Sequence, residues 1–173
     1  MKPKILLLLP FMALAFASCH DELEETVYSN LTDDTAFTSV ENAQAAVDAM
    51  YAPLHQIYRD PMFQASDGVT DVCFAIRTSS HLTTCWDNFF QVTSRANIVI
   101  DRVGAMDDAL FTDVDKGQMI AEAHFMRAYA YMQLSDLFYR VPLVLSSDID
   151  VKEKLPLASI DDIENAIETD LKA

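Results

Sequence analysis

The sequence predicts an all-α fold, and three observations support this. Glycine occurs only three times in 173 residues, which is fewer than the turns of an all-β domain require. Four segments carry apolar residues at steps of three and four, the period of a helix with one buried face. Hydrophobic residues make up 51% of the chain, so the core can be substantial, and the length fits a single domain.

The first predicted helix spans residues 39–58. Thr38 and Glu41 match a capping box, in which two side chains each bond the other's backbone N–H group. Pro53 lies inside the segment and predicts a kink, because proline lacks an N–H group and crowds the preceding turn. The apolar face of this helix is formed by Val40, Ala43, Val47, Met50, Leu54 and Ile57.

The second predicted helix spans residues 85–103, with Thr84 as its N-cap and Gly104 placed to end it. Asn97 lies on its apolar face and needs hydrogen-bond partners if it is buried. The same face carries Trp86, Phe89, Phe90, Thr93, Ala96, Ile100 and Val103.

The third predicted helix, residues 114–138, is the longest and the richest in aromatic residues. Val141-Pro142 ends it, because the residue before a proline avoids helical geometry, and residues 141–145 are predicted to be extended. Glu122 and Arg127 are five residues apart and do not face each other as an i, i+4 pair would. We expect each of them to bond a neighbouring helix rather than a ligand.

The fourth predicted helix starts near Ile160. Ser159 caps it, and Asp161 and Asp162 lie in the first turn, where the helix dipole favours acidic side chains. Its apolar face carries Ile160, Ile163, Ile167 and Leu171. The chain ends at Ala173 while this pattern is still running, with no later element to cover the face, which predicts an incomplete domain.

The N-terminus matches an export signal over residues 1–18. Lys2 and Lys4 precede an apolar stretch at 5–17, which is too short to span a bilayer, and Ala17-Ser18 supply the small residues of a cleavage site. Cys19 follows directly, which predicts lipoprotein processing with lipid attachment at Cys19. The alternative is an ordinary cleaved signal followed by an incidental cysteine.

The net charge of −15 argues against nucleic acid as a partner and against direct docking on anionic headgroups, since both select basic surfaces. Two further cysteines are present, Cys73 and Cys85. An exported chain could join them in a disulfide, and two buried free thiols are the alternative.

Five motifs, in order, resemble the N-terminal part of the RagB/SusD family of outer-membrane nutrient-uptake lipoproteins. They are Asp67-x3-Asp71, Trp86-x3-Phe90-x6-Asn97-x2-Ile100-Asp101, Ala121-Glu122-Ala123-x3-Arg127-Ala128-Tyr129-x4-Leu134, Val141-Pro142-Leu143-Val144, and Leu155-Pro156 with Ser159 and Asp170-Leu171. Two positions depart from the family pattern. Tyr139 stands where the family usually has glycine, and Ala158 stands where it usually has arginine.

This resemblance implies tetratricopeptide-like antiparallel helix pairs with long irregular loops. Residues 38–173 would be the N-terminal helical part of a SusD-like domain. The family's members face the cell exterior from the outer membrane, where a lipid anchor holds them. They capture oligosaccharides or polysaccharides and deliver them to a TonB-dependent, SusC-like transporter barrel. They perform no bond chemistry, so no cofactor is expected.

Residues 19–37 are predicted to be a lipidated cysteine followed by an acidic tether. The run Asp21–Glu25 can be a solvated linker that holds the domain away from the membrane. It also resembles the surface-export signal of Bacteroidetes lipoproteins, and both interpretations stay open.

Carbohydrate recognition needs flat aromatic faces and a few polar groups that orient hydroxyls. Trp86, the only tryptophan, is a candidate stacking platform, and core packing is the alternative because it lies on an apolar stripe. Arg77 and His81, in a predicted polar loop, are candidate hydroxyl-binding residues, and each can equally be a solvated loop residue.

The sequence predicts neither a catalytic residue nor a metal site. The spacing of Asp67 and Asp71 does not indicate the carboxylate pair of a glycosidase, and the four histidines lack metal-ligand spacing. Two other classes of function remain as alternatives: an exported glycoside hydrolase, or a helical interaction module of the cell envelope.

Overall fold

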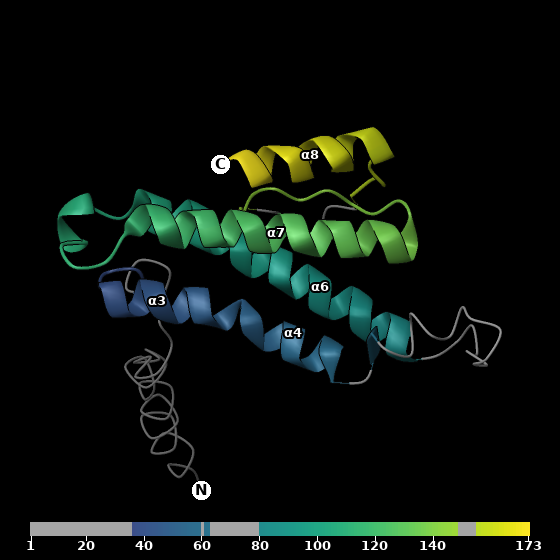
Figure 1. Ribbon diagram of the computed structural model, residues 1–173, viewed down its shortest axis with the longest axis horizontal. Helices are drawn as coiled ribbons and strands as arrows, with labels where there is room; N and C mark the ends of the chain where they lie inside the picture. The colour runs from purple at the N-terminus through teal and green to yellow at the C-terminus, as the bar shows by residue number, and fades with distance from the viewer. Residues whose placement is uncertain (1–35, 60, 63–79, 149–154) are drawn as a thin grey trace, which may run out of the picture. The chain divides into compact units, whose positions relative to one another are not determined.

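The structure, a computed structural model, describes residues 36–59, 61–62, 80–148 and 155–173 (Figure 1). All of them belong to the compact unit formed by residues 33–173. In this part of the chain the regular secondary structure is helical and contains no strand, which confirms the all-α prediction. The predicted signal peptide, Cys19, the Asp21–Glu25 run, Cys73 and Arg77 lie outside the described residues.

The helices are α3 (Val40–Ala49), α4 (Tyr51–Tyr58), α6 (Ser80–Ile98), α7 (Lys116–Phe138) and α8 (Ile160–Lys172). A π-helical turn η2 (Val99–Val103) continues α6, and a short 3₁₀ turn η3 (Asp108–Leu110) precedes α7. Among these described helices, none is both long and apolar enough to cross a membrane.

The pairs α6/α7 and α7/α8 run antiparallel, as predicted. Trp86 near the start of α6 contacts Phe138 at the end of α7, whereas Asn97 at the end of α6 binds Arg127 in the middle of α7. The backbone of Val141, just after α7, binds Ala158, just before α8. Figure 1 shows α7 between α6 and α8, with α3 and α4 in line on the side opposite α8.

The core lies where α6 and α7 pack against each other and against α3, α4 and α8. Each large apolar side chain that is fully buried contributes about 1.5–3 kcal/mol to stability. The largest fully buried side chains are Tyr131, Phe89, Met50, Ile57, Met126, Leu134, Ile163, Val47, Val92, Val99, Val103 and Val141.

The first predicted helix is divided into α3 and α4 at Met50, one turn before Pro53. Pro53 has no N–H group to offer the carbonyl of Ala49, and its ring crowds that carbonyl. The Arg95 guanidinium, from α6, donates a hydrogen bond to the Ala49 oxygen instead. The break therefore has the predicted cause, and a neighbouring helix satisfies the backbone group that proline leaves without an intrahelical donor.

Two predicted N-caps are wrong. The first helix is capped by Ser39, whose hydroxyl accepts from the Asn42 N–H, so the first turn starts one residue later than a Thr38 cap would place it. Helix α6 begins at Ser80, and Thr84 lies inside it with its hydroxyl donating to the Ser80 carbonyl. The sequence predicts Thr84 as a cap because a threonine hydroxyl can either cap a helix or bond a carbonyl one turn earlier in the same helix.

The second predicted helix also ends differently from the prediction. The chain passes through η2, and Gly104 follows with a right-handed φ of −55°. It therefore does not provide the left-handed turn for which glycine is usually selected at a helix end. Cys85 is a buried free thiol, which is the second of the two alternatives considered for it.

Helix α7 ends at Tyr139, whose φ of 68° is the one positive value among the described non-glycine residues. The Arg140 N–H donates to the Phe138 carbonyl at 2.9 Å, so Tyr139 is the central residue of a γ-turn with positive φ. This is the position at which the related sequences were expected to carry glycine. The residues after it, 141–146, follow an extended course outside any sheet.

Helix α8 begins with the predicted Ser159 cap, and Asp162 completes a capping box. The expectation that its apolar face lacks a partner is wrong for Ile163, which is fully buried, and for Ile167, which packs against the core. Leu171 is 59% exposed, whereas Asp170 is buried. The buried stripe therefore turns from apolar to acidic at the end of the helix, because an arginine on α7 lies opposite.

Candidate functional site

A network of buried polar side chains holds the extended segment 141–147 against α6 and α7. The Tyr131 hydroxyl accepts from the Val144 N–H at 2.7 Å and donates to the Val144 carbonyl at 2.9 Å. The Asn97 amide donates to the carbonyls of Val144 and Ser146 at 3.1 and 3.2 Å. These side chains satisfy backbone groups that have no strand partner. Asn97 is buried and has the hydrogen-bond partners that were predicted for it from the sequence.

Arg127 is the centre of this network. Its Nε and Nη2 donate to the two carboxylate oxygens of Asp170 at 2.8 and 2.6 Å. Its Nη1 donates to the Asn97 side-chain oxygen at 2.7 Å and to the Leu145 carbonyl at 3.1 Å. One guanidinium thus joins α6, α7, α8 and the extended segment. The prediction that Arg127 bonds a neighbouring helix is confirmed.

Asp170 is held as a carboxylate. Burial by itself would raise the pKa of Asp170, but the hydrogen bonds from Arg127 and from His124, whose Nδ1 lies 2.8 Å away, bring it below its ordinary value. A carboxyl held ionised cannot serve as the proton donor that glycosidic cleavage requires. The pair is therefore a structural ion pair that fixes α8 on α7.

The π-helical turn η2 places Asp101 at the end of the extended segment. Its carboxylate accepts from the Ser147 N–H at 2.7 Å. Burial would raise the pKa of Asp101, but the Ser147 and Ser146 hydrogen bonds and the charge of Arg127 lower it. Asp101 is four residues after Asn97 and therefore lies on the same side of the helix.

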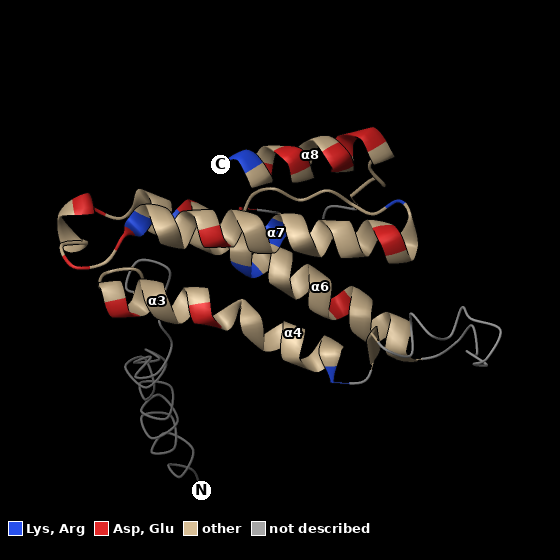
Figure 2. Ribbon diagram, viewed as in Figure 1, with Lys and Arg blue, Asp and Glu red and all other residues tan. Residues whose placement is uncertain are grey.

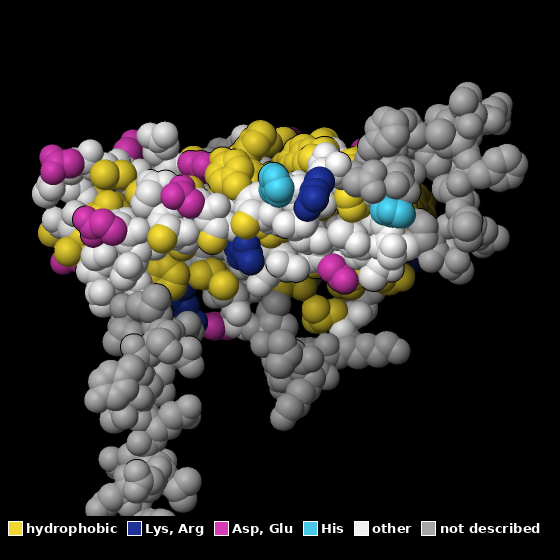
Figure 3. Space-filling model, turned by 90° about the horizontal axis from the view of Figure 1, so that it is seen from below, with side chains coloured by type: hydrophobic (Ala, Val, Ile, Leu, Met, Phe, Trp, Pro, Cys, Tyr) yellow, Lys and Arg dark blue, Asp and Glu magenta, His cyan; other side chains and the backbone are white. Residues whose placement is uncertain are grey.

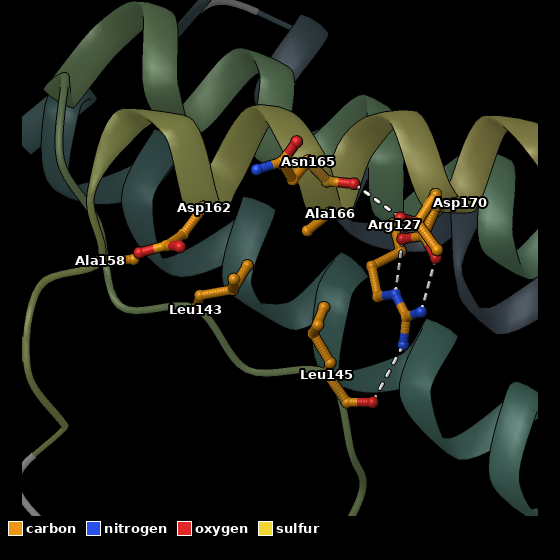
Figure 4. Close-up of a pocket in the computed structure, with 9 residues that line it drawn as sticks. Arg127, Leu143, Leu145, Ala158, Asp162, Asn165, Ala166 and Asp170 are labelled. Carbon is orange, nitrogen blue, oxygen red and sulfur yellow. Dashed lines mark hydrogen bonds and ion pairs between the residues drawn. The ribbon is translucent and has the colours of Figure 1, made fainter.

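An open groove of about 370 Å³ lies between α8 and the extended segment, with the Arg127–Asp170 pair at one end (Figure 4). Leu143 and Leu145 form one wall, and Asp162 and Asn165 on α8 line the other. Ala158, Ala166 and Thr169 complete the lining. Most of the polar lining is engaged: Asp162 in its capping box, Arg127 with Asp170, and Thr169 with a helix carbonyl. The groove offers apolar walls and a few polar groups to a ligand.

Two of the three predicted glycan-binding residues, His81 and Trp86, lie in the first half of α6, and Arg77 is outside the described residues. His81 lies in the first turn of α6, so its predicted position in a loop is wrong, because the helix begins five residues earlier than expected. Trp86 is half-buried and packs against Phe90 and Phe138, with ring centroids 4.8 and 4.9 Å apart. This packing favours the core alternative for Trp86 and leaves part of its ring accessible.

Sequence reasoning did not single out Tyr131, Asp101 and Asp170 as parts of one network. A signal was present for Asp170, which occurs seven residues after Ile163 and therefore on the same helix face. An acidic residue in line with an apolar stripe indicates a buried basic partner. Within the described residues, no group of His, Cys, Asp or Glu side chains could hold a metal ion.

Acidic side chains predominate on the described surface. Figure 2 marks acidic residues along α8 and in the connection between η2 and α7, whereas lysine and arginine residues are few. This distribution matches the negative charge of the sequence and disfavours anionic ligands.

A family described as SusD-like, starch-binding and associating with the outer membrane matches residues 22–173. The chain belongs to this family. A SusD-like protein from Bacteroides ovatus is 29% identical over 158 residues, which cover 83% of this chain and 29% of that protein. The chain therefore spans less than a third of the length of this relative.

Solved structures share the fold of this SusD-like chain. One described as containing a xylogluco-oligosaccharide superposes with a TM-score of 0.59 at 23% identity, over 75% of this chain and 28% of the other. A laminarin-binding SusD-like protein gives a TM-score of 0.60 at 19% identity, over 78% and 33% of the two chains. At these identities the similarity establishes the fold.

Proposed function

We propose that this SusD-like chain is part of a surface lipoprotein that binds oligosaccharides and delivers them to a TonB-dependent transporter without cleaving them. The observation that carries the proposal is the family match over residues 22–173, because the family is described as starch-binding and associating with the outer membrane. The glycan ligands named for two proteins of the same fold support a glycan as the ligand class.

A binding role rather than catalysis is supported by the chemistry of the described residues. Asp170, the most buried carboxylate of the groove, is neutralised by Arg127 and kept ionised. Retaining and inverting glycosidases both need one carboxyl group that can donate a proton. The carboxylate that the fold buries is therefore used to hold helices together.

The proposed glycan contacts are Arg77, His81 and the accessible part of the Trp86 ring, close together in sequence. Tryptophan offers an apolar face to the C–H groups of a sugar, and the cationic and imidazole side chains can bind hydroxyls. Trp86 is held in a fixed orientation by Phe90 and Phe138, so little conformational entropy would be lost on stacking.

The proposed anchor is a lipid on Cys19, which follows the apolar stretch 5–17 directly. Several acyl chains on one residue would hold the protein stably at a membrane, whereas one chain holds only marginally. The acidic run Asp21–Glu25 would then separate the folded unit from the bilayer, and the transporter would be its protein partner.

The proposal is tested by affinity electrophoresis of the purified protein in gels containing starch, laminarin or xyloglucan, with an assay for released reducing ends. We expect retardation by at least one neutral glucan and no release of reducing ends. Arg77→Ala and His81→Ala should reduce the retardation, whereas Lys172→Ala, which removes an exposed cation at the end of α8, should not. Absence of retardation in every gel, or cleavage of the glucan, would overturn the proposal.

A further inference from the structure

Four residues on α4 and α7 form a second aromatic surface, separate in sequence from Trp86. Tyr51, Tyr58 and Phe125 are 45%, 49% and 56% exposed, and Tyr129 is half-buried beside them. Single exposed apolar residues are normal, but a group of large rings on adjacent elements indicates a binding surface. Figure 3 looks onto the side where α3 and α4 lie and shows hydrophobic side chains gathered there.

The rings are fixed by hydrogen bonds between the two helices. The Tyr51 hydroxyl donates to the Glu122 carboxylate, and the Tyr58 and Tyr129 hydroxyls are hydrogen-bonded to each other. Both pairs are separated by 71 residues, so a step of seven residues on α4 matches a step of seven on α7. The two helices therefore run in the same direction here. Tyrosine hydrogen bonds join them at two positions that are two helical turns apart.

The arrangement also provides parallel ring faces. Phe125 and Tyr129, one helical turn apart, have planes within 14° of each other and centroids 6.5 Å apart. Two nearly parallel rings one helical turn apart can present faces in the same direction. This is the arrangement that consecutive sugar units of an extended chain can cover, because each unit has an apolar face of C–H groups.

The polar groups around these rings suit a neutral ligand. Glu122 can accept hydrogen bonds from sugar hydroxyls, and its carboxylate repels an anionic chain. The Tyr51 hydroxyl is held protonated, because its hydrogen bond to Glu122 and its burial raise its pKa to about 12.

We infer that the surface formed by Tyr51, Tyr58, Phe125, Tyr129 and Glu122 is an additional binding surface for a neutral oligosaccharide chain, stacked on Phe125 and Tyr129. This inference rests on the proposed glycan-binding function. It assigns to helices α4 and α7 a contact that uses none of Arg77, His81 and Trp86. A chain that engages both surfaces would bind more tightly than one that engages either alone.

The test compares Phe125→Ala with Phe125→Tyr and with Leu171→Ala, a control that removes a similarly exposed apolar side chain from α8. Affinity for laminarin and xyloglucan is measured by titration calorimetry on the purified full chain. We expect Phe125→Ala to weaken binding about fivefold to tenfold. Phe125→Tyr, which keeps the ring, and Leu171→Ala should each retain the affinity of the unsubstituted protein.

Each contrary outcome has its own meaning. If the unsubstituted protein binds the glucans and Phe125→Ala binds them equally well, the inference is wrong and the proposed function stands. If the unsubstituted protein binds no neutral glucan, the proposed function fails and this inference fails with it. If the protein is a dimer in sedimentation and Phe125→Ala is a monomer with unchanged glucan affinity, the surface is a self-association site and the inference is overturned.

Discussion

Arg127 and Asp170 lie 43 residues apart and form a two-point ion pair in which the side chains are only 7% and 3% exposed. The arginine also binds Asn97 and the Leu145 carbonyl, so the pair joins three helices to an extended segment. Such a pair makes the position of α8 depend on one residue, because an unpaired charge left in this place would be strongly unfavourable.

Replacing Asp170 should therefore destabilise the fold. Asp170→Ala leaves the Arg127 guanidinium buried without its counter-charge, and we expect the free energy of unfolding in urea to fall by about 3–5 kcal/mol. Glu164→Ala removes an exposed carboxylate from the same helix and should change it by less than about 0.5 kcal/mol. Equal effects of the two substitutions would show that the ion pair contributes little.

Stability should decrease in acid through the same carboxylate. The pKa of Asp170 is lower in the folded protein than in the unfolded chain, so its stabilising effect is complete above the unfolded value of about 3.9. That effect is lost as the pH falls through the lower folded value. Urea unfolding between pH 6 and pH 3 should show this fall, and Asp170→Asn should make the dependence on pH shallower.

The relationship between Pro53 and Arg95 can be tested with a double-mutant cycle. Arg95→Met keeps the apolar stem but leaves the Ala49 carbonyl without its donor, which should cost about 1–3 kcal/mol. Pro53→Ala restores a backbone N–H that can bond the same carbonyl. The cost of Arg95→Met should then be smaller by about 1 kcal/mol in the Pro53→Ala background. Additive effects in thermal or urea unfolding would contradict this account.

Tyr139→Gly should stabilise the protein. Tyr139 has a φ of 68°, which is strained for any residue with a Cβ atom, and its side chain is 69% exposed, so little packing is lost. We expect a gain of about 1 kcal/mol after subtracting the extra entropy of glycine in the unfolded chain. Tyr139→Ala is the matched control. It keeps the Cβ atom and should give no gain in stability. If Tyr139→Ala and Tyr139→Gly stabilise the protein equally, the gain comes from removing the tyrosine ring and not from relieving backbone strain.

The anchor can be tested in cells. Cys19→Ala should abolish lipid attachment, and the protein should move from the detergent phase to the aqueous phase in a phase-partitioning experiment. Cys73→Ala should leave partitioning unchanged, because Cys73 is far along the sequence from the predicted cleavage site before Cys19. Retention of the Cys19→Ala protein in the detergent phase would mean that another feature holds it at the membrane.

The helical elements were predictable because their signals are local. The apolar steps of α3, α7 and α8, the Ser159 cap and the break caused by Pro53 depend on residues within one or two turns. The predictions failed where the same local sequence is compatible with two structures. Thr84 can cap a helix or bond back to its own helix, and the choice depends on the turn formed by Ser80 and the residues after it.

The candidate sites were less predictable than the helices. Trp86 lies on an apolar stripe, and the sequence does not say that Phe90 and Phe138 would fix its ring while leaving part of it accessible. The aromatic surface of α4 and α7 had no signal of its own, because Tyr51 and Tyr58 meet Glu122 and Tyr129 from 71 positions away. Such long-range pairs depend on how helices pack.

The sequence by itself determined the helical class, the order and faces of the helices, and the family resemblance, since all three are carried by residue type and spacing along the chain. Only the tertiary structure decided which polar residues meet: Arg127 with Asp170, Tyr131 with Val144, and Arg95 with the carbonyl that Pro53 leaves without a donor. The physical reason is that a buried polar group must find a partner, and the nearest partner in space depends on helix packing rather than on distance along the chain.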